Sequence, residues 1–180
     1  AAGLPHGGGK SVIIADPAMP LAEKKRLIHA FARAIEQLSD YIPGPDMGTN
    51  EVCMAWVRDE IGRAVGLPRV IGGIPLDEIG ATGLGVAVAA EVAEPFSGVA
   101  LKGAKIAIQG YGAVGRHAAR FLAQKGARIV AVADSGGTAI CPDGFDLSRL
   151  DPLKTGGQSV TAYPGATLAD RDAVIRADCD

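Results

Sequence analysis

Aromatic side chains are scarce in this sequence and make up only 4% of its 180 residues. Hydrophobic residues still reach 48%, so a buried core must be built from alanine, valine, isoleucine and leucine. Small aliphatic side chains of this kind suit the close packing of helices on a sheet. The composition therefore excludes a disordered chain and predicts one ordinary domain or two small ones.

The sequence also lacks excess charge and long apolar runs. The formal net charge is −2, which gives no reason to expect nucleic acid or an acidic membrane as a partner. The longest apolar runs, residues 86–90 and 129–133, are far too short to span a bilayer. No positively charged segment followed by an apolar stretch opens the chain, so we expect no secretory signal and a cytoplasmic protein.

Cysteine is rare as well. Cys53, Cys141 and Cys179 are scattered along the chain, and none has the Cys-x-x-Cys spacing of a metal site. We therefore expect three small buried hydrophobic residues in a reducing compartment, and no bound metal.

The first part of the chain combines a β-branched run with a helical pattern. Residues 11–15 are predicted to form a short strand, which Asp16 and Pro17 end. Apolar side chains then recur at helical spacing over residues 21–38, with charged residues on the opposite face. This pattern predicts an amphipathic helix.

A loop rich in proline and glycine, residues 41–49, precedes a second helical pattern. Asn50 has the residue type of an N-cap for a helix over residues 51–64. Residues 66–80 contain four glycines and two prolines. They are therefore predicted to form the loop between two domains.

The pattern changes after this loop. A helix rich in small residues is predicted over residues 82–96. Residues 105–109 and 128–134 predict two buried strands, with a helix over residues 112–124 between them. Strand, helix and strand at this spacing predict a parallel βαβ unit with a right-handed crossover, and therefore an α/β fold.

The rest of the chain is predicted to be mostly loop. We expect loop structure after Asp134, and then a short helix over residues 167–177 with Thr167 as its cap. We expect residues 178–180 to be the beginning of another strand, which is then cut off.

A glycine-rich sequence joins the first buried strand to the following helix. Gly110, Gly112 and Gly115 have the Gly-x-Gly-x-x-Gly spacing of dinucleotide-binding loops. Gly110 permits a tight turn, and Gly112 lets a pyrophosphate approach the amides at the helix N-terminus. Gly115 lets the helix pack closely on the strand. The plainer alternative is that these glycines only shape a turn and bind nothing.

An acidic residue ends the second buried strand. The carboxylate of Asp134 can accept both hydroxyls of an adenosine ribose at this position, which favours NAD. The neighbouring Ser135 would tolerate a phosphate, so NADP is kept as the alternative. The predicted coenzyme-binding residues of this region are Gly110, Tyr111, Gly112, Ala113, Val114, Gly115, Asp134 and Ser135.

Lys10 follows three consecutive glycines and precedes a serine, as the lysine of a P-loop does. The P-loop spacing requires a further glycine where this sequence has Leu4, and a helix where residues 11–15 predict a strand. The phosphate-binding interpretation is therefore rejected. Lys10 is either an ordinary surface lysine or a partly desolvated lysine that performs acid–base chemistry in a cleft.

Asp46 lies in the proline- and glycine-rich loop just before the second predicted helix. Loops held in this way often carry functional side chains. The alternative is that Asp46 serves only as a turn residue or as an additional helix cap.

Four segments together resemble one known family, the glutamate/leucine/phenylalanine/valine dehydrogenases. The segment "LPHGGGKSVI" resembles the glycine-rich lysine segment of that family, and "IPGPDMGT" resembles its Pro-x-Pro-Asp-x-Gly-Thr loop. The segment "ATGLGV" is similar to the start of one of its helices, and "IQGYGAVG" is similar to its coenzyme fingerprint. The resemblance extends over nearly the whole chain in sequence order.

The resemblance implies reversible NAD(P)-dependent oxidative deamination of an L-amino acid, most closely glutamate, to a 2-oxo acid and ammonia. Lys10 would be the catalytic lysine that deprotonates the attacking water, and Asp46 the aspartate that moves the proton of the substrate nitrogen. Thr82 would lie near the nicotinamide carboxamide. A homo-oligomer is also implied.

The resemblance further implies that residues 1–66 are part of a catalytic domain and that residues 67–80 are a junction. Residues 81–180 would be a Rossmann-type NAD-binding domain that is incomplete at its C-terminus, so the chain would be a fragment. Two alternatives stay open. One is a leucine, phenylalanine or valine dehydrogenase, and the other is a non-catalytic remnant that binds a dinucleotide or forms an oligomer.

Overall fold

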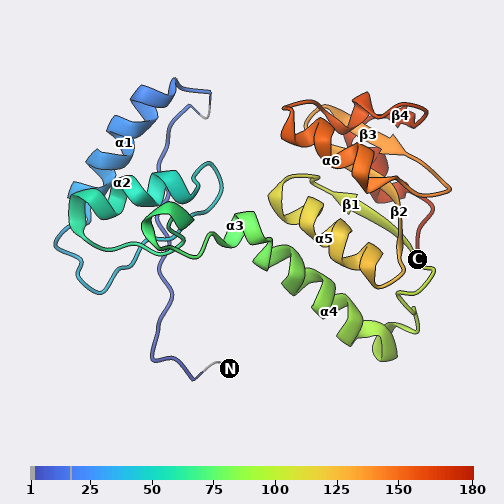
Figure 1. Cartoon of the computed structure of the whole chain (residues 1–180), viewed down its shortest axis with the longest axis horizontal. Helices are drawn as coiled ribbons and strands as arrows, with labels where there is room; N and C mark the ends of the chain where they lie inside the picture. The colour runs from blue at the N-terminus through green and yellow to red at the C-terminus, as the bar shows by residue number, and fades with distance from the viewer. Residues whose placement is uncertain (1–2, 17) are drawn as a thin grey trace. The chain divides into compact units, whose positions relative to one another are not determined.

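The computed structural model describes residues 3–16 and 18–180 of the chain. It contains two compact units, one extending to Pro75 and the other beginning at Leu76 (Figure 1). Among the described residues, every helix is too short or too polar to cross a membrane.

The first unit is built from two helices packed against each other. α1 spans Leu21–Ala34, α2 spans Glu51–Ile61, and a 3-10 turn covers Arg69–Ile71. One face of each long helix is apolar, and the two faces enclose a small core. The buried members of this core are Ile28, Ala32, Cys53, Met54 and Val57.

Both helices predicted for this part exist, but both end earlier than predicted. The side chain of Asn50 caps α2, as predicted, because it accepts a hydrogen bond from the Cys53 amide. α2 ends at Ile61 instead of residue 64, because Gly62 turns the backbone into the left-handed region with φ 75°. α1 ends at Ala34 instead of residue 38.

The end of α1 is bound by the side chain of Arg63. Its guanidinium donates hydrogen bonds to the carbonyls of Ile35, Glu36, Leu38 and Tyr41, at distances of 2.8 to 3.0 Å. Carbonyls at a helix C-terminus have no partner within the helix and carry partial negative charge, so a guanidinium suits them. This one side chain therefore determines how the chain leaves α1 and connects that exit to the end of α2.

The strand predicted over residues 11–15 is wrong. These residues are irregular, and Ile13 is the one whose side chain packs on the helical core. A strand is stable only when a neighbouring strand accepts and donates its backbone hydrogen bonds, and the described part of the first unit contains no such neighbour. Pro17, predicted to end this strand, lies outside the described residues.

The second unit contains a four-stranded mixed sheet. β1 (Lys105–Gln109) and β2 (Arg128–Asp134) are parallel, and α5 (Ala113–Gln124) connects them. β3 (Gly137–Ile140) pairs with β2 and β4 (Thr167–Ala169) pairs with β3, both antiparallel, which gives the order β1-β2-β3-β4. The predicted βαβ unit and the α/β fold are confirmed.

Helices and 3-10 turns accompany this sheet (Figure 1). They are α3 (Leu76–Ile79), α4 (Ala81–Ser97), α6 (Leu147–Thr155) and the 3-10 turns Val160–Ala162 and Arg171–Arg176. α4 agrees with the helix predicted over residues 82–96. α3 and the turn Arg69–Ile71 lie in the segment 66–80 that was predicted to be loop, so that segment is only partly irregular.

Small side chains let α4, α5 and β2 approach closely. Residues 129–133 of β2 are at most 2% exposed, and Ala119 of α5 is fully buried in the same core as Ile129 and Val132. α4 crosses α5 at Gly83, where a Cβ atom would lie 2.6 Å from the amide nitrogen of Ala118. Only glycine fits at this crossing, so the many small residues of α4 serve helix packing.

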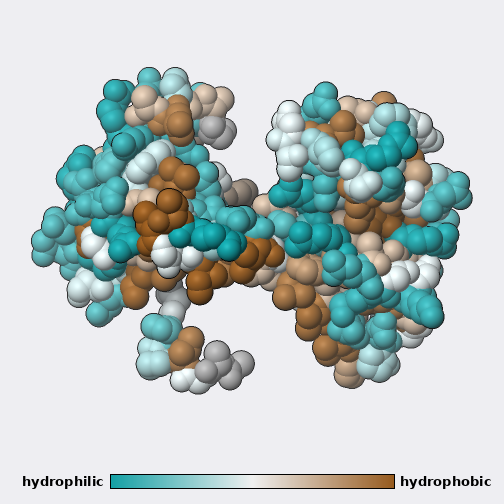
Figure 2. Space-filling view, viewed as in Figure 1, coloured by the Kyte–Doolittle hydropathy of each residue, from teal (hydrophilic) through white to brown (hydrophobic). Residues whose placement is uncertain are grey.

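The other face of α4 is apolar but uncovered. Leu84, Val88, Val92 and Phe96 recur every four residues and are all more than 40% exposed. In Figure 2, brown surface is visible where Figure 1 places α4. Since one helix face packs on α5 and the opposite face is also apolar, the second unit by itself leaves part of this helix in water.

The predictions after Asp134 are largely wrong. The segment predicted as loop contains β3 and α6, and Thr167 begins β4 instead of capping a helix. The turn that follows β4 is capped by Asp170, whose carboxylate accepts a hydrogen bond from the Asp172 amide at 3.0 Å. Short strands such as β4 depend on pairing with a distant partner, so their local pattern is weak.

Residues 178–180, predicted to begin a strand, are irregular. The amide of Asp180 nevertheless donates a hydrogen bond to the carbonyl of Lys105, the first residue of β1, at 3.0 Å. The Lys105 amide donates in turn to the Asp180 carboxylate at 2.8 Å. The segment therefore lies at the start of β1, although it forms no strand.

Replacing Arg63 with lysine should lower the free energy of unfolding by about 2 kcal/mol, because one ammonium cannot reach four carbonyls and leaves some of them unpaired. Urea unfolding measures this change. Arg58→Lys is the matched control, since Arg58 makes one long hydrogen bond of 3.4 Å to the carbonyl of Ile71. Equal stability of the two variants would contradict the role assigned to Arg63.

His117 of α5 makes stability depend on pH. Its side chain is 6% exposed, and burial, followed by the charges of Arg120 and Arg116, lowers its pKa below the ordinary 6.5. The unfolded chain therefore takes up a proton before the folded chain does, and the free energy of unfolding falls as the pH drops below about 6.5. Urea unfolding at pH 7, 6 and 5 should show a smaller fall for His117→Gln. The same fall in both proteins would contradict this prediction.

Candidate functional site

The first candidate site brings together Lys10 and Asp46, which are 36 residues apart in the sequence. The ammonium of Lys10 forms an ion pair with the Oδ2 atom of Asp46. Both side chains remain largely exposed, at 70% and 57%. The resemblance implied a catalytic role for each residue but did not predict this contact, and the desolvation considered for Lys10 is not seen.

The loop before α2 orients Asp46. The hydroxyl of Thr49 accepts a hydrogen bond from the Asp46 amide at 2.8 Å and donates one to the Asp46 carbonyl at 2.9 Å. The Met47 amide donates to the second carboxylate oxygen, Oδ1, at 2.6 Å. Oδ2 is therefore the oxygen that faces Lys10, and the carboxylate is fixed before any ligand arrives.

A pocket of about 380 Å³ in the first unit is lined by both residues. Lys24 of α1 contributes a second ammonium, and Thr49 contributes a hydroxyl. The apolar part of the wall includes Leu27 and Phe31 of α1. A small molecule with carboxylate groups and a short apolar body fits these linings, because lysines pair with carboxylates and the aliphatic wall excludes water.

Of the three glycines before Lys10, only Gly9 lies close to another residue. A Cβ atom at Gly9 would lie 3.2 Å from the ring of Tyr41, whereas Cβ atoms at Gly7 and Gly8 would meet nothing within 4 Å. The close backbone approach expected for the whole segment is therefore confined to one glycine.

The second candidate site is the loop between β1 and α5. The amides of Gly110 and Tyr111 both donate to the carbonyl of Ala133, at 3.0 and 2.8 Å. Gly110 has φ 89°, and a Cβ atom at Gly115 would lie 2.1 Å from the Gly110 carbonyl oxygen. These two glycines therefore have the turn-forming and close-packing roles predicted for them.

The next three residues, Gly112, Ala113 and Val114, form the N-terminus of α5 and are exposed. In the part of the chain that the structure describes, their amides have no intramolecular acceptor. A Cβ atom at Gly112 would meet nothing within 4 Å, so the space next to these amides is open. Unpaired amides at a helix N-terminus attract anions, and a pyrophosphate fits this arrangement.

The side chain of Tyr111 faces away from this site. It is fully buried, and its hydroxyl donates a hydrogen bond to the carboxylate of Asp151 on α6 at 2.8 Å. Burial, followed by the hydrogen bond to Asp151, raises the pKa of Tyr111 well above its usual range. Its predicted coenzyme-binding role therefore does not extend to its side chain, which connects the loop to α6.

Asp134 ends β2 as predicted, but its carboxylate is already occupied. Oδ2 accepts hydrogen bonds from the Lys154 ammonium at 2.5 Å and from the Val160 amide at 2.9 Å. Oδ1 accepts from the Ser159 hydroxyl and the Gly136 amide, both at 2.8 Å. With four donors in place, no lone pair is left for the ribose hydroxyls that the sequence predicted as its partners.

These contacts also set the ionisation of Asp134, whose side chain is 10% exposed. Burial would raise the pKa of this carboxyl, but the hydrogen bonds from Lys154, Val160, Ser159 and Gly136 together outweigh it and lower the pKa to about 2. Asp134 is therefore a largely buried carboxylate of the β2–β3 hairpin that stays ionised at neutral pH.

Thr82 and Ser135 are both exposed. Thr82 lies in the first turn of α4, and Ser135 lies at the tip of the turn between β2 and β3. Neither hydroxyl makes a hydrogen bond within the described residues. The contacts predicted for them with a coenzyme stay predictions.

The cysteines are not gathered with other metal-binding side chains in the part of the chain that the structure describes. Within residues 3–16 and 18–180, no three side chains of histidine, cysteine, aspartate or glutamate lie together as a metal site would require. Cys53 is buried as predicted, but Cys141 is half-buried and Cys179 is exposed. The prediction of three buried cysteines is therefore correct only for Cys53.

Two lysines that contribute to these sites were missed in the sequence. Lys24 precedes Leu27, Ile28 and Phe31 by three, four and seven positions, so the helical period already assigns it to the core side of α1. Lys154 has no such signal, because its partner Asp134 lies on another element and only tertiary structure brings them together.

Known proteins resemble this chain over nearly its whole length. A family model of the glutamate/leucine/phenylalanine/valine dehydrogenases matches residues 72–180, and a model of the dimerisation domain of the same enzymes matches residues 1–63. The chain is 37% identical to an NADP-specific glutamate dehydrogenase of Saccharolobus shibatae, over 98% of this chain and 45% of that protein. It is 34% identical to a cryptic catabolic NAD-specific glutamate dehydrogenase of Bacillus subtilis, over 98% of this chain and 44% of that protein.

Solved structures of glutamate dehydrogenases are also similar to this chain. A hetero-hexameric glutamate dehydrogenase from Thermus thermophilus superposes with a TM-score of 0.78 at 29% identity, over 92% of this chain and 42% of that chain. A glutamate dehydrogenase from Peptoniphilus asaccharolyticus superposes with a TM-score of 0.65 at 30% identity, over 88% of this chain and 45% of that chain. The chain therefore spans less than half the length of each of these relatives.

Replacing Lys154 with methionine should raise the pKa of the Asp134 carboxyl from about 2 toward or above the ordinary 3.8. The folded pKa lies below the unfolded one, so this carboxylate stabilises the fold above about pH 3.8, and that contribution is lost as the pH falls toward 2. A carbon NMR titration of aspartate side chains measures the pKa directly. An unchanged Asp134 titration in Lys154→Met would contradict the contact.

Proposed function

Because the chain belongs to the glutamate/leucine/phenylalanine/valine dehydrogenase family, we propose that it takes part in the reversible oxidative deamination of an L-amino acid. The products would be a 2-oxo acid and ammonia. The observation that carries this proposal is the ion pair of Lys10 and Asp46 at a pocket of about 380 Å³. An acid and a base in contact beside one pocket suit a reaction that moves protons on both water and nitrogen.

A nicotinamide dinucleotide is the coenzyme that fits this chain. The open space at Gly112 and the three unpaired amides of residues 112–114 would hold its pyrophosphate. When bound, the nicotinamide ring would take up the hydride from the substrate α-carbon. Thr82 and Ser135, with their exposed hydroxyls, are further proposed contacts of the coenzyme.

Lys10 and Asp46 would then share the proton transfers. Lys10 would take a proton from the water that attacks the substrate carbon and would later return it. Asp46 would give a proton to the departing nitrogen and take one from the incoming ammonia. The contact between Nζ of Lys10 and Oδ2 of Asp46 supports this division of roles, because a proton can pass between the two groups directly.

Glutamate is the substrate that we propose within the family. Lys24 lines the same pocket as Lys10, and its ammonium would pair with the second carboxylate of glutamate. The relatives named above are all glutamate dehydrogenases. Leucine, phenylalanine and valine lack the second carboxylate and would leave Lys24 unpaired.

We further propose that the protein forms a homo-oligomer. The match of residues 1–63 to the dimerisation domain of the family supports this assembly. The similar glutamate dehydrogenase from Thermus thermophilus is a hetero-hexamer.

A panel of L-amino acids with NAD or NADP tests the proposed activity by the absorbance of the reduced nicotinamide. Glutamate should give the highest rate. Binding of the dinucleotide without turnover of any amino acid would contradict the enzymatic proposal and favour a non-catalytic binding module.

Lys10→Met and Asp46→Asn should each lower turnover by about a hundredfold to ten-thousandfold, which is the usual contribution of a positioned acid or base. Dinucleotide binding should change little in either variant. Lys25→Met and Asp59→Asn are matched controls, since both residues are exposed and neither lines the pocket. Near-normal turnover in Lys10→Met or Asp46→Asn would refute the role proposed for that residue.

A further inference from the structure

Tyr111 immediately precedes the three unpaired amides of the candidate coenzyme site. Its own amide donates a hydrogen bond to the carbonyl of Ala133 at 2.8 Å, whereas the amides of residues 112–114 have no acceptor among the described residues. The planar peptide group that follows Tyr111 carries the first of these free amides, that of Gly112. The orientation of Tyr111 therefore sets the direction in which the free amides begin.

The ring of Tyr111 is enclosed in the core of the second unit. It is the largest fully buried side chain among the described residues, and it belongs to the same cluster as Leu150 of α6. A buried tyrosine hydroxyl requires a hydrogen-bond partner. Here the partner is the carboxylate of Asp151 on α6, whose Oδ1 atom accepts the bond at 2.8 Å.

The hydroxyl of Tyr111, and not its ring alone, connects the glycine-rich loop to α6. A hydrogen bond from a hydroxyl to a carboxylate is shorter and stronger than one between neutral groups. The Asp151 carboxylate accepts no second hydrogen bond within the part of the chain that the structure describes. A phenylalanine would fill the same volume as Tyr111, but it would leave the loop without this connection.

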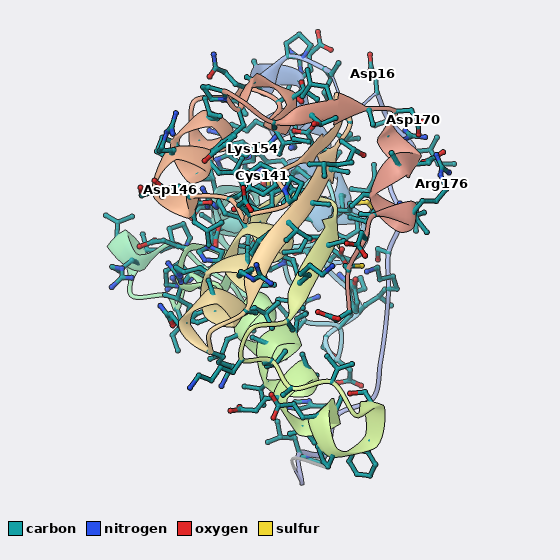
Figure 3. The ribbon with its side chains drawn as sticks, turned by 90° about the vertical axis from the view of Figure 1, so that its right-hand side faces the viewer. Asp16, Cys141, Asp146, Lys154, Asp170 and Arg176 are labelled. Atoms are coloured by element: carbon teal, nitrogen blue, oxygen red, sulfur yellow. The ribbon has the colours of Figure 1, made fainter. Side chains whose placement is uncertain are left out.

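α6 can serve as an anchor because it is held at both ends. At its start, the Asp146 carboxylate accepts a hydrogen bond from the Ser148 amide at 2.9 Å. Near its end, the ammonium of Lys154 binds Asp134. Figure 3 labels both Asp146 and Lys154. Asp151 lies between them, so its carboxylate is presented to Tyr111 from a fixed helix.

We propose that Tyr111 and Asp151 are a positioning pair, which holds the amides of residues 112–114 in the orientation that a pyrophosphate requires. The pair acts through the backbone of the loop, because the Tyr111 side chain is buried in the core. A loop that is ordered before its ligand arrives loses less conformational entropy on binding, so the ligand binds more tightly. This inference rests on the proposed binding of a nicotinamide dinucleotide at residues 110–115.

Calorimetric titration of NAD into the wild-type protein and into Tyr111→Phe tests this role. Loss of the hydroxyl should raise the dissociation constant of NAD by about tenfold, which corresponds to the usual contribution of one hydrogen bond. Asp151→Ala removes the acceptor and should raise the constant by a similar factor. The two substitutions combined should raise it no further, since both remove the same bond.

Asp151→Asn is the conservative variant. Its side-chain amide oxygen can still accept the hydrogen bond from the Tyr111 hydroxyl, although without the help of a negative charge. The dissociation constant of NAD should therefore rise by only about threefold or less.

Tyr163→Phe is the matched control. Tyr163 is 8% exposed and belongs to the same core cluster as Tyr111. Its hydroxyl accepts a hydrogen bond from the Asp146 amide at 3.2 Å, so this variant deletes the same atom at a bond that does not involve the glycine-rich loop. It should leave the dissociation constant of NAD unchanged.

NMR relaxation of the free protein gives a second measurement, which a merely structural role would not change. Tyr111→Phe should lower the order parameters of the amides of residues 112–114, while Tyr163→Phe should leave them at the wild-type values. A merely structural role would lower the unfolding temperature in both variants and would leave the order parameters and the dissociation constant unchanged.

The outcomes separate this inference from the proposed function. If Tyr111→Phe binds NAD as the wild type does, or if Tyr163→Phe weakens binding equally, the positioning role is overturned while dinucleotide binding stands. If the wild type binds no NAD, the proposed function fails, and the positioning role fails with it. Should Tyr111→Phe not fold, Asp151→Ala compared with Asp151→Asn decides the same question.

Discussion

The close approach of α5 to the loop that follows β1 is the constraint on which the second unit depends. A Cβ atom at Gly115 would overlap the carbonyl oxygen of Gly110 at 2.1 Å, and one at Gly83 would overlap the amide of Ala118 at 2.6 Å. Glycine at both positions lets α5 lie directly on the strand and lets α4 lie directly on α5. Any side chain there would push the helix away from the sheet and open the core around β2.

The same constraint produces the candidate coenzyme site. With α5 held against the end of β1, the carbonyl of Ala133 accepts hydrogen bonds from the amides of Gly110 and Tyr111, and the next amides have no partner among the described residues. Their exposure is therefore a direct result of the packing and not a separate feature. α6 completes this region, since it supplies Asp151 to Tyr111 and Lys154 to Asp134.

Sequence patterns were sufficient for the elements whose signal is local. Residues 105–109 and 128–134 are continuous apolar runs, and both are strands with the predicted bounds. The glycine spacing at 110–115 likewise predicted the turn and the close helix contact. The catalytic roles of Lys10 and Asp46 came from the family resemblance, and their contact was not predicted, because neither residue has a pattern that points to the other.

Sequence patterns failed where a contact with a residue distant in the sequence determines the structure. β4 exists because it pairs with β3, and residues 11–15 form no strand because no partner strand is present in the described part of the first unit. The saturation of Asp134 could not be predicted either, since its donors are contributed by residues 20 to 26 positions further along the chain as well as by the adjacent turn. A motif can therefore predict where a carboxylate lies, but not whether it is free to bind a ligand.

The most direct test of the account is an NMR titration of the isotope-labelled protein with NAD, followed through its backbone amides. The largest shifts should occur at Gly112, Ala113 and Val114, whose amides have no acceptor within the part of the chain that the structure describes. Amides of Gly110 and Tyr111, already bonded to Ala133, should shift less. Shifts that avoid residues 112–114, or no shifts at all with millimolar NAD, would contradict the central claim that this loop binds the coenzyme.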